Sequence, residues 1–225
     1  MLANLYGSTL GKKAVMASTG ILLCGFVLAH LLGNLKIYQG SEKFNAYAEG
    51  LRIVGAPFFG HGQVLWLARL ALLAAAVLHV HSAWALTLVN RGARPVDYAR
   101  RDAVAASYAA RTMRWSGVLL LLFVLYHLAH FTWGFAWAHP DFVTGDVYHN
   151  VIAGFRVWWV AAFYLAAQVA LGLHLDHGIW SLFQSLGWSG PISNRWRRPL
   201  ARGFALLVTV GNVSFPLAVL GGVLS

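Results

Sequence analysis

Five long apolar runs alternate with shorter polar links along the 225-residue chain. A membrane-spanning helix needs about 20 consecutive, mostly apolar residues. The runs cover residues 14–35, 64–89, 115–137, 151–182 and 204–224. None shows the alternation of apolar and polar residues that is typical of a membrane barrel strand. The pattern predicts an all-α integral membrane bundle of five transmembrane helices, which forms a single domain over residues 1–225.

The composition supports a membrane protein. Hydrophobic residues make up 59% of the chain and charged residues 11%, with a mean hydropathy of +0.62. A soluble domain has about a quarter charged residues, so these values exclude a soluble enzyme, a disordered chain and a nucleic-acid-binding module, in spite of the net charge of +10. The single cysteine, Cys24, excludes a disulfide framework, a cysteine-ligated zinc site and a bound iron–sulfur cluster.

The basic residues predict the orientation of the bundle. Most lie in the N-terminal flank, in the link between runs two and three, and in the link before run five: Lys12, Lys13, Arg91, Arg94, Arg100, Arg101, Arg111, Arg114, Arg195, Arg197, Arg198 and Arg202. The links on the other side hold only Lys36, Lys43 and Arg52, and Arg156 lies at the start of run four. Because cytoplasmic links are rich in Lys and Arg, we expect the N-terminus in the cytoplasm and the C-terminus outside.

Histidines are the candidate functional residues. Seven of the ten lie in or at the ends of the apolar runs: His30, His79, His81, His127, His130, His174 and His177. Ionisable side chains inside a membrane are costly and usually face the bundle interior with a function. A single histidine of this kind can also serve as an interhelical hydrogen-bond partner.

The depths of these histidines fall into two levels. Counted from the predicted outer ends of their runs, His30 and His127 lie about 8 and 11 residues in, whereas His79 and His174 lie about 17 and 22 residues in. One level therefore combines runs one and three, and the other combines runs two and four, about 15 Å away. Axial ligation of a haem by two imidazoles requires histidines from two facing helices at matched depth. The pattern favours two haems, one at each level.

Depth alone does not select one histidine within each cluster, nor does it exclude every other site. His127 and His130 share a helix face, as do His174 and His177. A zinc site would lack the cysteine or carboxylate ligands that usually accompany histidine. A proton relay in a membrane transporter would need carboxylates at mid-membrane, whereas the only acidic residue inside a run is Asp176, near the predicted cytoplasmic end.

Four motifs, in order along the chain, resemble the five-helix cytochrome b subunit of succinate dehydrogenase/fumarate reductase. They are GKKAVMASTGILLCGFVLAHLLGNLKIYQGSEKFNAYAEGLR at residues 11–52, LHVHSAWALTLVNRGARPVDY at residues 78–98, YHLAHF at residues 126–131 and HLDHGIWSLFQSLG at residues 174–187. The resemblance covers four of the five runs and the links between them. Run five is similar only as an apolar helix.

The resemblance implies a di-haem membrane anchor of succinate:quinone oxidoreductase in a bacterial-type cytoplasmic membrane. A flavoprotein subunit and an iron–sulfur subunit would bind its cytoplasmic face, and the quinone usual in this family is menaquinone. The axial ligands would be His30 and His127 for the distal haem b and His79 and His174 for the proximal haem b. A cytochrome b of another dehydrogenase, such as a hydrogenase, is the related alternative.

Other residues are candidates for weaker roles. Arg69 lies inside run two, where it would meet a distal haem propionate or extend to the outer headgroups. Ser18, Thr19, Arg114 and Trp115 are candidates to line the proximal haem or a quinone. Glu49 and Asp146 would relay protons at an outer quinone site, or are simply solvated loop charges. Small residues early in run one, among them Gly20, favour close packing.

Overall fold

The computed structural model describes residues 6–93, 108–188 and 190–225. It is helical throughout this part of the chain, with no strand among the described residues. The helices are α2 (Thr9–Asn34), the 3-10 turn η1 (Leu35–Gln39), α3 (Ser41–Gly50), α4 (Gln63–Gly92), α5 (Tyr108–His127), the π-helical turn η3 (Leu128–Thr132), α6 (Val147–Arg156), α7 (Trp158–Ser185) and α8 (Pro191–Leu220). Within the described residues, five helical segments are long and apolar enough to cross a membrane. The predicted all-α chain with five candidate spans is confirmed.

Helix boundaries differ from the apolar runs where polar groups take part in the helix. α2 begins at Thr9 because the Ser8 side chain accepts a hydrogen bond from the backbone N–H of Gly11 at 2.9 Å and caps the helix. α8 begins at Pro191 and not at residue 204, so its first turns are basic. Proline suits the first turn of a helix because it lacks the N–H that would be unpaired there.

The third and fourth predicted spans need larger corrections. The third ends at Thr132 and not at residue 137, because η3 is followed by turns and a Gly134 with φ of 60°. The fourth is divided in two. Val157 takes an extended conformation, with φ −78° and ψ 101°, between α6 and α7. Only α7 is a candidate span, and α6 is a separate short helix.

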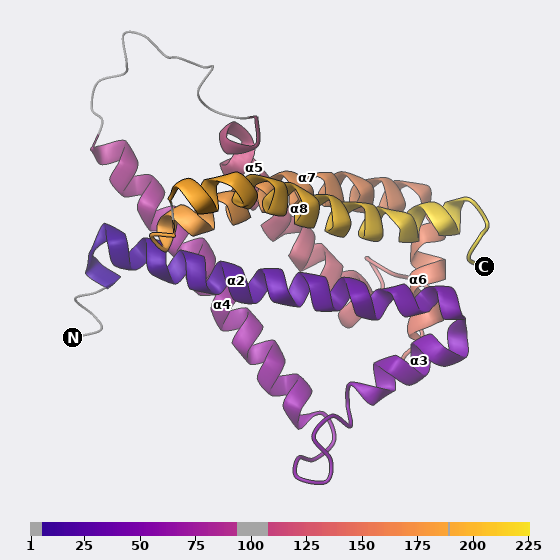
Figure 1. Cartoon of the computed structure of the whole chain (residues 1–225). Helices are drawn as coiled ribbons and strands as arrows, with labels where there is room; N and C mark the ends of the chain where they lie inside the picture. Colours follow the sequence, from indigo (N-terminus) through magenta and orange to yellow (C-terminus); the bar gives the residue numbers. More distant parts are fainter. Residues whose placement is uncertain (1–5, 94–107, 189) are drawn as a thin grey trace.

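The helices α2, α7 and α8 run side by side, and α5 packs against α7 (Figure 1). The core between them includes Leu31, Ala161 and Val208, which are almost fully buried. Close packing here depends on a glycine. A Cβ on Gly211 would lie 2.7 Å from Cδ1 of Leu31, so only glycine lets α8 approach α2 at this point. This core holds three of the five spans together.

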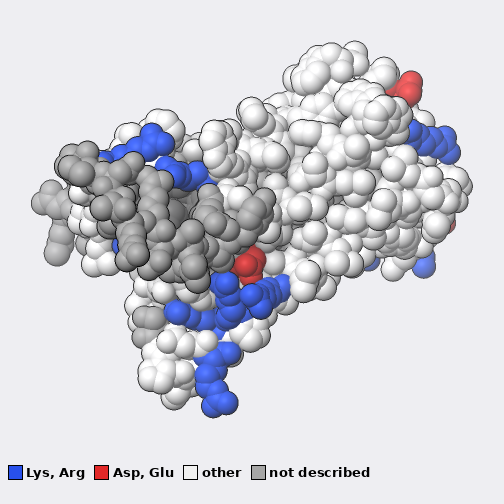
Figure 2. Space-filling model, turned by 90° about the horizontal axis from the view of Figure 1, so that it is seen from above, with Lys and Arg blue, Asp and Glu red and all other residues white. Residues whose placement is uncertain are grey.

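The two ends of the molecule differ in composition. One end, which we call the basic end, is formed where α2, α5 and α8 begin and where α4 and α7 end (Figure 1). Lys12, Arg91, Arg114 and Arg198 belong to it, and Lys and Arg gather there in the space-filling view (Figure 2). Arg94, Arg100 and Arg101 lie outside the described residues. The opposite end carries α3, α6 and the C-terminus.

α4 stands apart from the other spans. It packs mainly against α2 and crosses it near the basic end. Toward the opposite end it diverges from the rest of the bundle (Figure 1). The first part of α4 therefore packs less closely on the bundle than the other spans do.

Candidate functional site: two facing histidine pairs

His79 and His174 face each other from α4 and α7. Their ring centres are 6.4 Å apart, with an angle of 58° between the ring planes. We call them the proximal pair because they lie nearer the basic end. Two imidazoles that bind one metal through nitrogen at about 2 Å, with about 1 Å from each nitrogen to its ring centre, have ring centres about 6 Å apart. The observed separation fits that arrangement.

Hydrogen bonds fix which nitrogen of His79 carries the proton. Its Nδ1 lies 3.1 Å from the backbone carbonyl oxygen of Met16 and 3.3 Å from Oγ1 of Thr19, both on α2. A carbonyl oxygen only accepts, so Nδ1 donates and Nε2 of the neutral ring carries no hydrogen. This is the arrangement in which a histidine presents Nε2 to a metal.

His174 is held in the same way by α5. Its Nδ1 lies 3.2 Å from Oγ of Ser116, whose own hydrogen goes to the carbonyl oxygen of Met113 at 2.9 Å. The Ser116 oxygen is thus the acceptor, and His174 also leaves Nε2 without a hydrogen. Two such nitrogens, one on each ring of a facing pair, have no hydrogen to share. Each of them carries an electron pair that could bind a metal.

Glycines leave space beside both proximal rings. A Cβ on Gly20 of α2 would lie 3.5 Å from Cε1 of His79, and one on Gly117 of α5 would lie 3.7 Å from Cε1 of His174. Cε1 adjoins Nε2 in the imidazole ring. A larger side chain at either position would occupy the space beside the imidazole.

His30 and His127 form the second pair, which we call the distal pair. Their ring centres are 5.9 Å apart and their planes meet at 90°. Phe26 stacks on His30 at 5.4 Å between ring centres, and Phe123 packs on His127 at 5.7 Å. Each distal imidazole therefore has an aromatic ring packed against it.

The distance between the two levels can be counted along α2 and along α5. On α2, Thr19 contacts the proximal pair and His30 belongs to the distal pair. On α5, Ser116 and His127 mark the same two levels. In both cases the step is eleven residues in sequence, or about 16 Å along a helix. The structure thus has two histidine pairs at two depths, close to the expected separation.

The other histidines in the spans have different surroundings. Nδ1 of His81 lies 2.6 Å from the hydroxyl of Tyr6. The ring of His177 lies 5.7 Å from that of Trp180, and its buried Nδ1 has no hydrogen-bond partner in the structure. His130 is only 1% exposed and lies among aromatic side chains away from His30. The structure therefore distinguishes histidines that sequence depth left equivalent.

The weaker candidates lie in varied places. Thr19 contacts His79, as described, whereas Ser18, Arg114 and Trp115 are exposed. The Arg69 guanidinium lies 5.0 Å from the centre of the Trp66 ring, on the diverging part of α4. Its predicted contact with a propionate stays a prediction. Sequence reasoning missed Met16, Ser116 and Tyr164, because no local motif marks residues that hydrogen-bond to a histidine on another helix.

Both loop carboxylates have local partners at the opposite end. A hydrogen bond from His61 at 3.0 Å, together with the guanidinium of Arg52, holds the pKa of Glu49 below its usual value. The backbone N–H of His149 and the side-chain amide of Asn45, each at 2.9 Å, lower the pKa of Asp146. Both groups are therefore ionised at neutral pH, and each ties neighbouring segments together.

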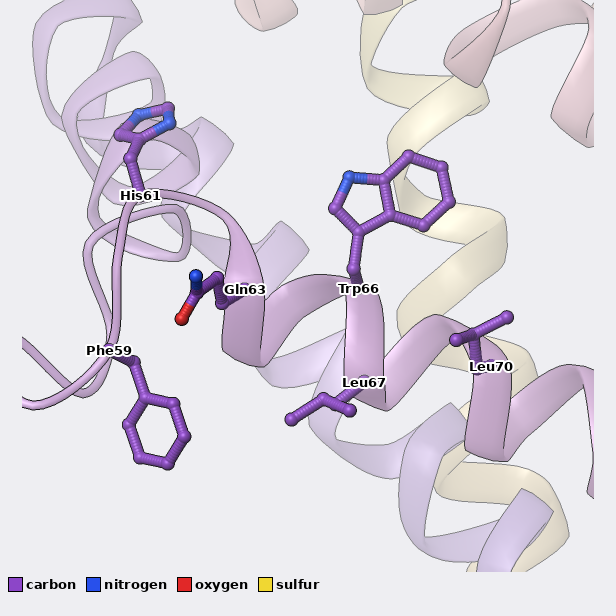
Figure 3. A pocket seen from close by; sticks show the side chains of 6 residues that line it. All are labelled: Phe59, His61, Gln63, Trp66, Leu67 and Leu70. Atoms are coloured by element: carbon purple, nitrogen blue, oxygen red, sulfur yellow. The ribbon is translucent and has the colours of Figure 1, made fainter.

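A pocket of about 380 Å³ lies where α4 begins (Figure 3). Its walls are apolar apart from one imidazole and one amide, and the lining residues are Phe59, His61, Gln63, Trp66, Leu67 and Leu70. The Gln63 side chain already accepts a hydrogen bond from the Gly60 backbone at 3.0 Å. All six lining residues are exposed, so the pocket is shallow and open.

No group of three or more His, Cys, Asp or Glu side chains that could hold a metal ion lies within residues 6–93, 108–188 and 190–225. Four of the histidines form two facing pairs, which is the arrangement that axial ligation by two side chains requires. Comparisons with models of protein families, with curated proteins and with solved structures gave no match for this chain. The family resemblance of the four motifs therefore stays a prediction.

Proposed function

We propose that this chain is the di-haem cytochrome b membrane subunit of a succinate:quinone oxidoreductase. The observation that carries the proposal is the proximal pair: two imidazoles on facing helices, with ring centres 6.4 Å apart and both Nδ1 atoms engaged as donors. The distal pair repeats this separation at a second depth. Two haem b groups, held by His79 with His174 and by His30 with His127, fit these pairs.

When bound, the two haems would supply one-electron carriers at two depths of the membrane. The chain's own residues prepare their sites. Met16, Thr19 and Ser116 orient the proximal imidazoles and set their tautomers. Phe26 and Phe123 pack against the distal imidazoles. Imidazoles that are held in place in this way favour fast electron transfer because little needs to reorganise when the charge changes.

The proposed partners follow from the two ends. The basic end would face the cytoplasm, in accord with the positive-inside rule, and would bind the flavoprotein and iron–sulfur subunits, on which succinate or fumarate reacts. A quinone, menaquinone in this proposal, would react at a membrane face. The apolar pocket with His61 and Gln63 is a candidate for its polar head. The protein would be a multi-pass component of a bacterial-type cytoplasmic membrane.

The decisive test is a haem-to-protein ratio with a reduced-minus-oxidised spectrum on the purified chain. The same measurements follow for variants in which His30, His79, His127 or His174 is replaced. We expect two b-type haems, and each substitution should eliminate the low-spin signal of its own pair only. The matched control is His81→Ala, because His81 contacts Tyr6 and belongs to neither pair.

A folded chain that takes up no haem when supplied with it would overturn the proposal and favour a histidine-based transporter. Copurification separates the two electron-transfer candidates. Recovery with a flavoprotein that oxidises succinate supports the proposed enzyme, whereas recovery with a hydrogenase overturns it in favour of the related cytochrome b.

A further inference from the structure

His130, a buried histidine outside both pairs, is linked to His127 of the distal pair through Tyr164. The hydroxyl of Tyr164, on α7, lies 3.3 Å from Nδ1 of His127 and 3.0 Å from Nδ1 of His130. Tyr164 is 5% exposed and His130 is 1% exposed. Water therefore does not replace either hydrogen bond, and the three side chains share the available hydrogens among themselves.

Counting hydrogens gives this chain of three groups a direction. The phenol has one hydrogen and lies between two imidazole nitrogens, so it can donate to only one of them, and the other nitrogen forms a hydrogen bond only by donating to the oxygen. If Nε2 of His127 faces a metal at the distal pair, its hydrogen is on Nδ1, as in the proximal pair. His127 then donates to Tyr164, and Tyr164 donates to Nδ1 of His130.

His130 cannot exchange roles with His127 because the backbone fixes it elsewhere. It lies in the π-helical turn η3, where the N–H of Trp133 bonds to the carbonyl of Leu128 at 2.8 Å. The extra residue in this turn rotates His130 away from the helix face of His127. The edge of its ring that carries Nε2 rests on α6: a Cβ on Gly154 would lie 2.9 Å from that nitrogen.

We propose that Tyr164 and His130 are positioning residues that fix the tautomer and electron-donating strength of His127 as the distal ligand. The proposal rests on the proposed function and deepens it. A hydrogen bond that accepts the Nδ1 proton makes an imidazole a stronger donor through Nε2. The Tyr164 hydroxyl, held in place by His130, therefore favours the oxidised state at the distal pair. The proximal pair uses Met16 and Ser116 for the same purpose.

The test is a potentiometric titration of the haem-loaded chain, read at both haems by their optical and electron paramagnetic resonance spectra. Tyr164→Phe removes only the hydroxyl. We expect the equilibrium constant for one-electron reduction at the distal pair to rise about tenfold, which is about 59 mV toward higher potential. The proximal pair should not change. His130→Leu should shift the distal potential in the same direction, whereas His130→Gln, which keeps an acceptor, should restore it.

Tyr126→Phe is the matched control. Tyr126 packs against Tyr164 and His130, with ring centres 6.2 and 5.4 Å away, but its buried hydroxyl has no hydrogen-bond partner in the structure. Its removal alters the same cluster without breaking this chain. A distal potential that is the same in Tyr164→Phe as in Tyr126→Phe would overturn the inference while leaving the proposed function intact. A wild-type chain without haem would overturn the proposed function itself.

Discussion

Gly20 lies on α2 against the imidazole of His79, and the space beside it allows a graded test of the proximal site. A Cβ at this position would lie 3.5 Å from Cε1 and 3.8 Å from Nδ1 of His79. Both are ordinary contact distances, so alanine fits. A leucine adds carbons about 1.5 Å and more beyond Cβ. These carbons must then displace the ring or fill the space next to Nε2.

The two substitutions at this position should have opposite effects. Gly20→Ala removes a glycine from a helix interior and should stabilise the chain by about 0.5–1 kcal/mol, with both haems retained. Gly20→Leu overpacks the site at a cost of about 1–3 kcal/mol. A cost of that size corresponds to about a 5- to 150-fold loss of haem affinity at the proximal pair. The distal pair, about 16 Å along α2, should keep its haem.

The assay is the haem-to-protein ratio after purification with haem supplied at the lowest concentration that fills both sites of the wild type, with spectra that separate the two sites. The control is Gly25→Leu on the same helix, because a Cβ on Gly25 meets nothing within 4 Å. We expect one haem in Gly20→Leu and two in wild type, Gly20→Ala and Gly25→Leu. Two haems with an unchanged proximal signal in Gly20→Leu would refute the reasoning, as would an equal loss in Gly25→Leu.

Three further predictions concern the opposite end and the ligand geometry. Asp146→Ala should lower the free energy of unfolding by about 1 kcal/mol through loss of a helix cap, whereas Asp146→Asn should cost less, as measured by thermal unfolding in detergent at pH 7. The pKa of Asp146 is lowered in the folded chain. Ionised Asp146 therefore stabilises the folded chain above the unfolded pKa of about 3.9, and this stabilisation is lost as the pH falls through the folded pKa. The difference in stability between wild type and Asp146→Ala should vanish in acid. Gly154→Ala should destabilise the chain by about 1–3 kcal/mol, since its Cβ would lie 2.8 Å from Cε1 of the buried His130, whereas Gly203→Ala, with nothing within 4 Å, should not. The perpendicular distal rings, at 90° against 58° in the proximal pair, should give the more anisotropic low-spin electron paramagnetic resonance signal, and indistinguishable signals would count against this geometry.

The spans and the depths of the histidines were accessible from sequence because both depend on helix periodicity and length. Apolar runs of membrane length located all five candidate spans. The rise of a helix placed His30 near the level of His127, and His79 near the level of His174. The errors at the helix ends came from local hydrogen bonding. The Ser8 cap and the extended backbone at Val157 have no counterpart in hydropathy.

The finer features of the site depend on contacts between distant segments. Ser116 reaches His174 across 58 positions of sequence, and Tyr164 reaches His127 across 37. Nothing in a local pattern selects that serine from the others. The π-helical turn that separates the roles of His127 and His130 was equally hidden, because hydropathy assumes a regular helix. The sequence identified Gly20 only as a small residue and did not indicate that it lies beside His79.

The packing of α4 has a consequence for what a bound cofactor would stabilise. Of the two helices that carry the proximal pair, α7 is fixed in the core, whereas α4 packs mainly on α2 and diverges from the bundle along its first half. A haem held by His79 and His174 would link α4 to α7. Under the proposed function, a chain without haem would hold α4 mainly through its packing on α2. The position of α4 relative to α7 would then depend on the cofactor more than the packing of α2, α7 and α8 does.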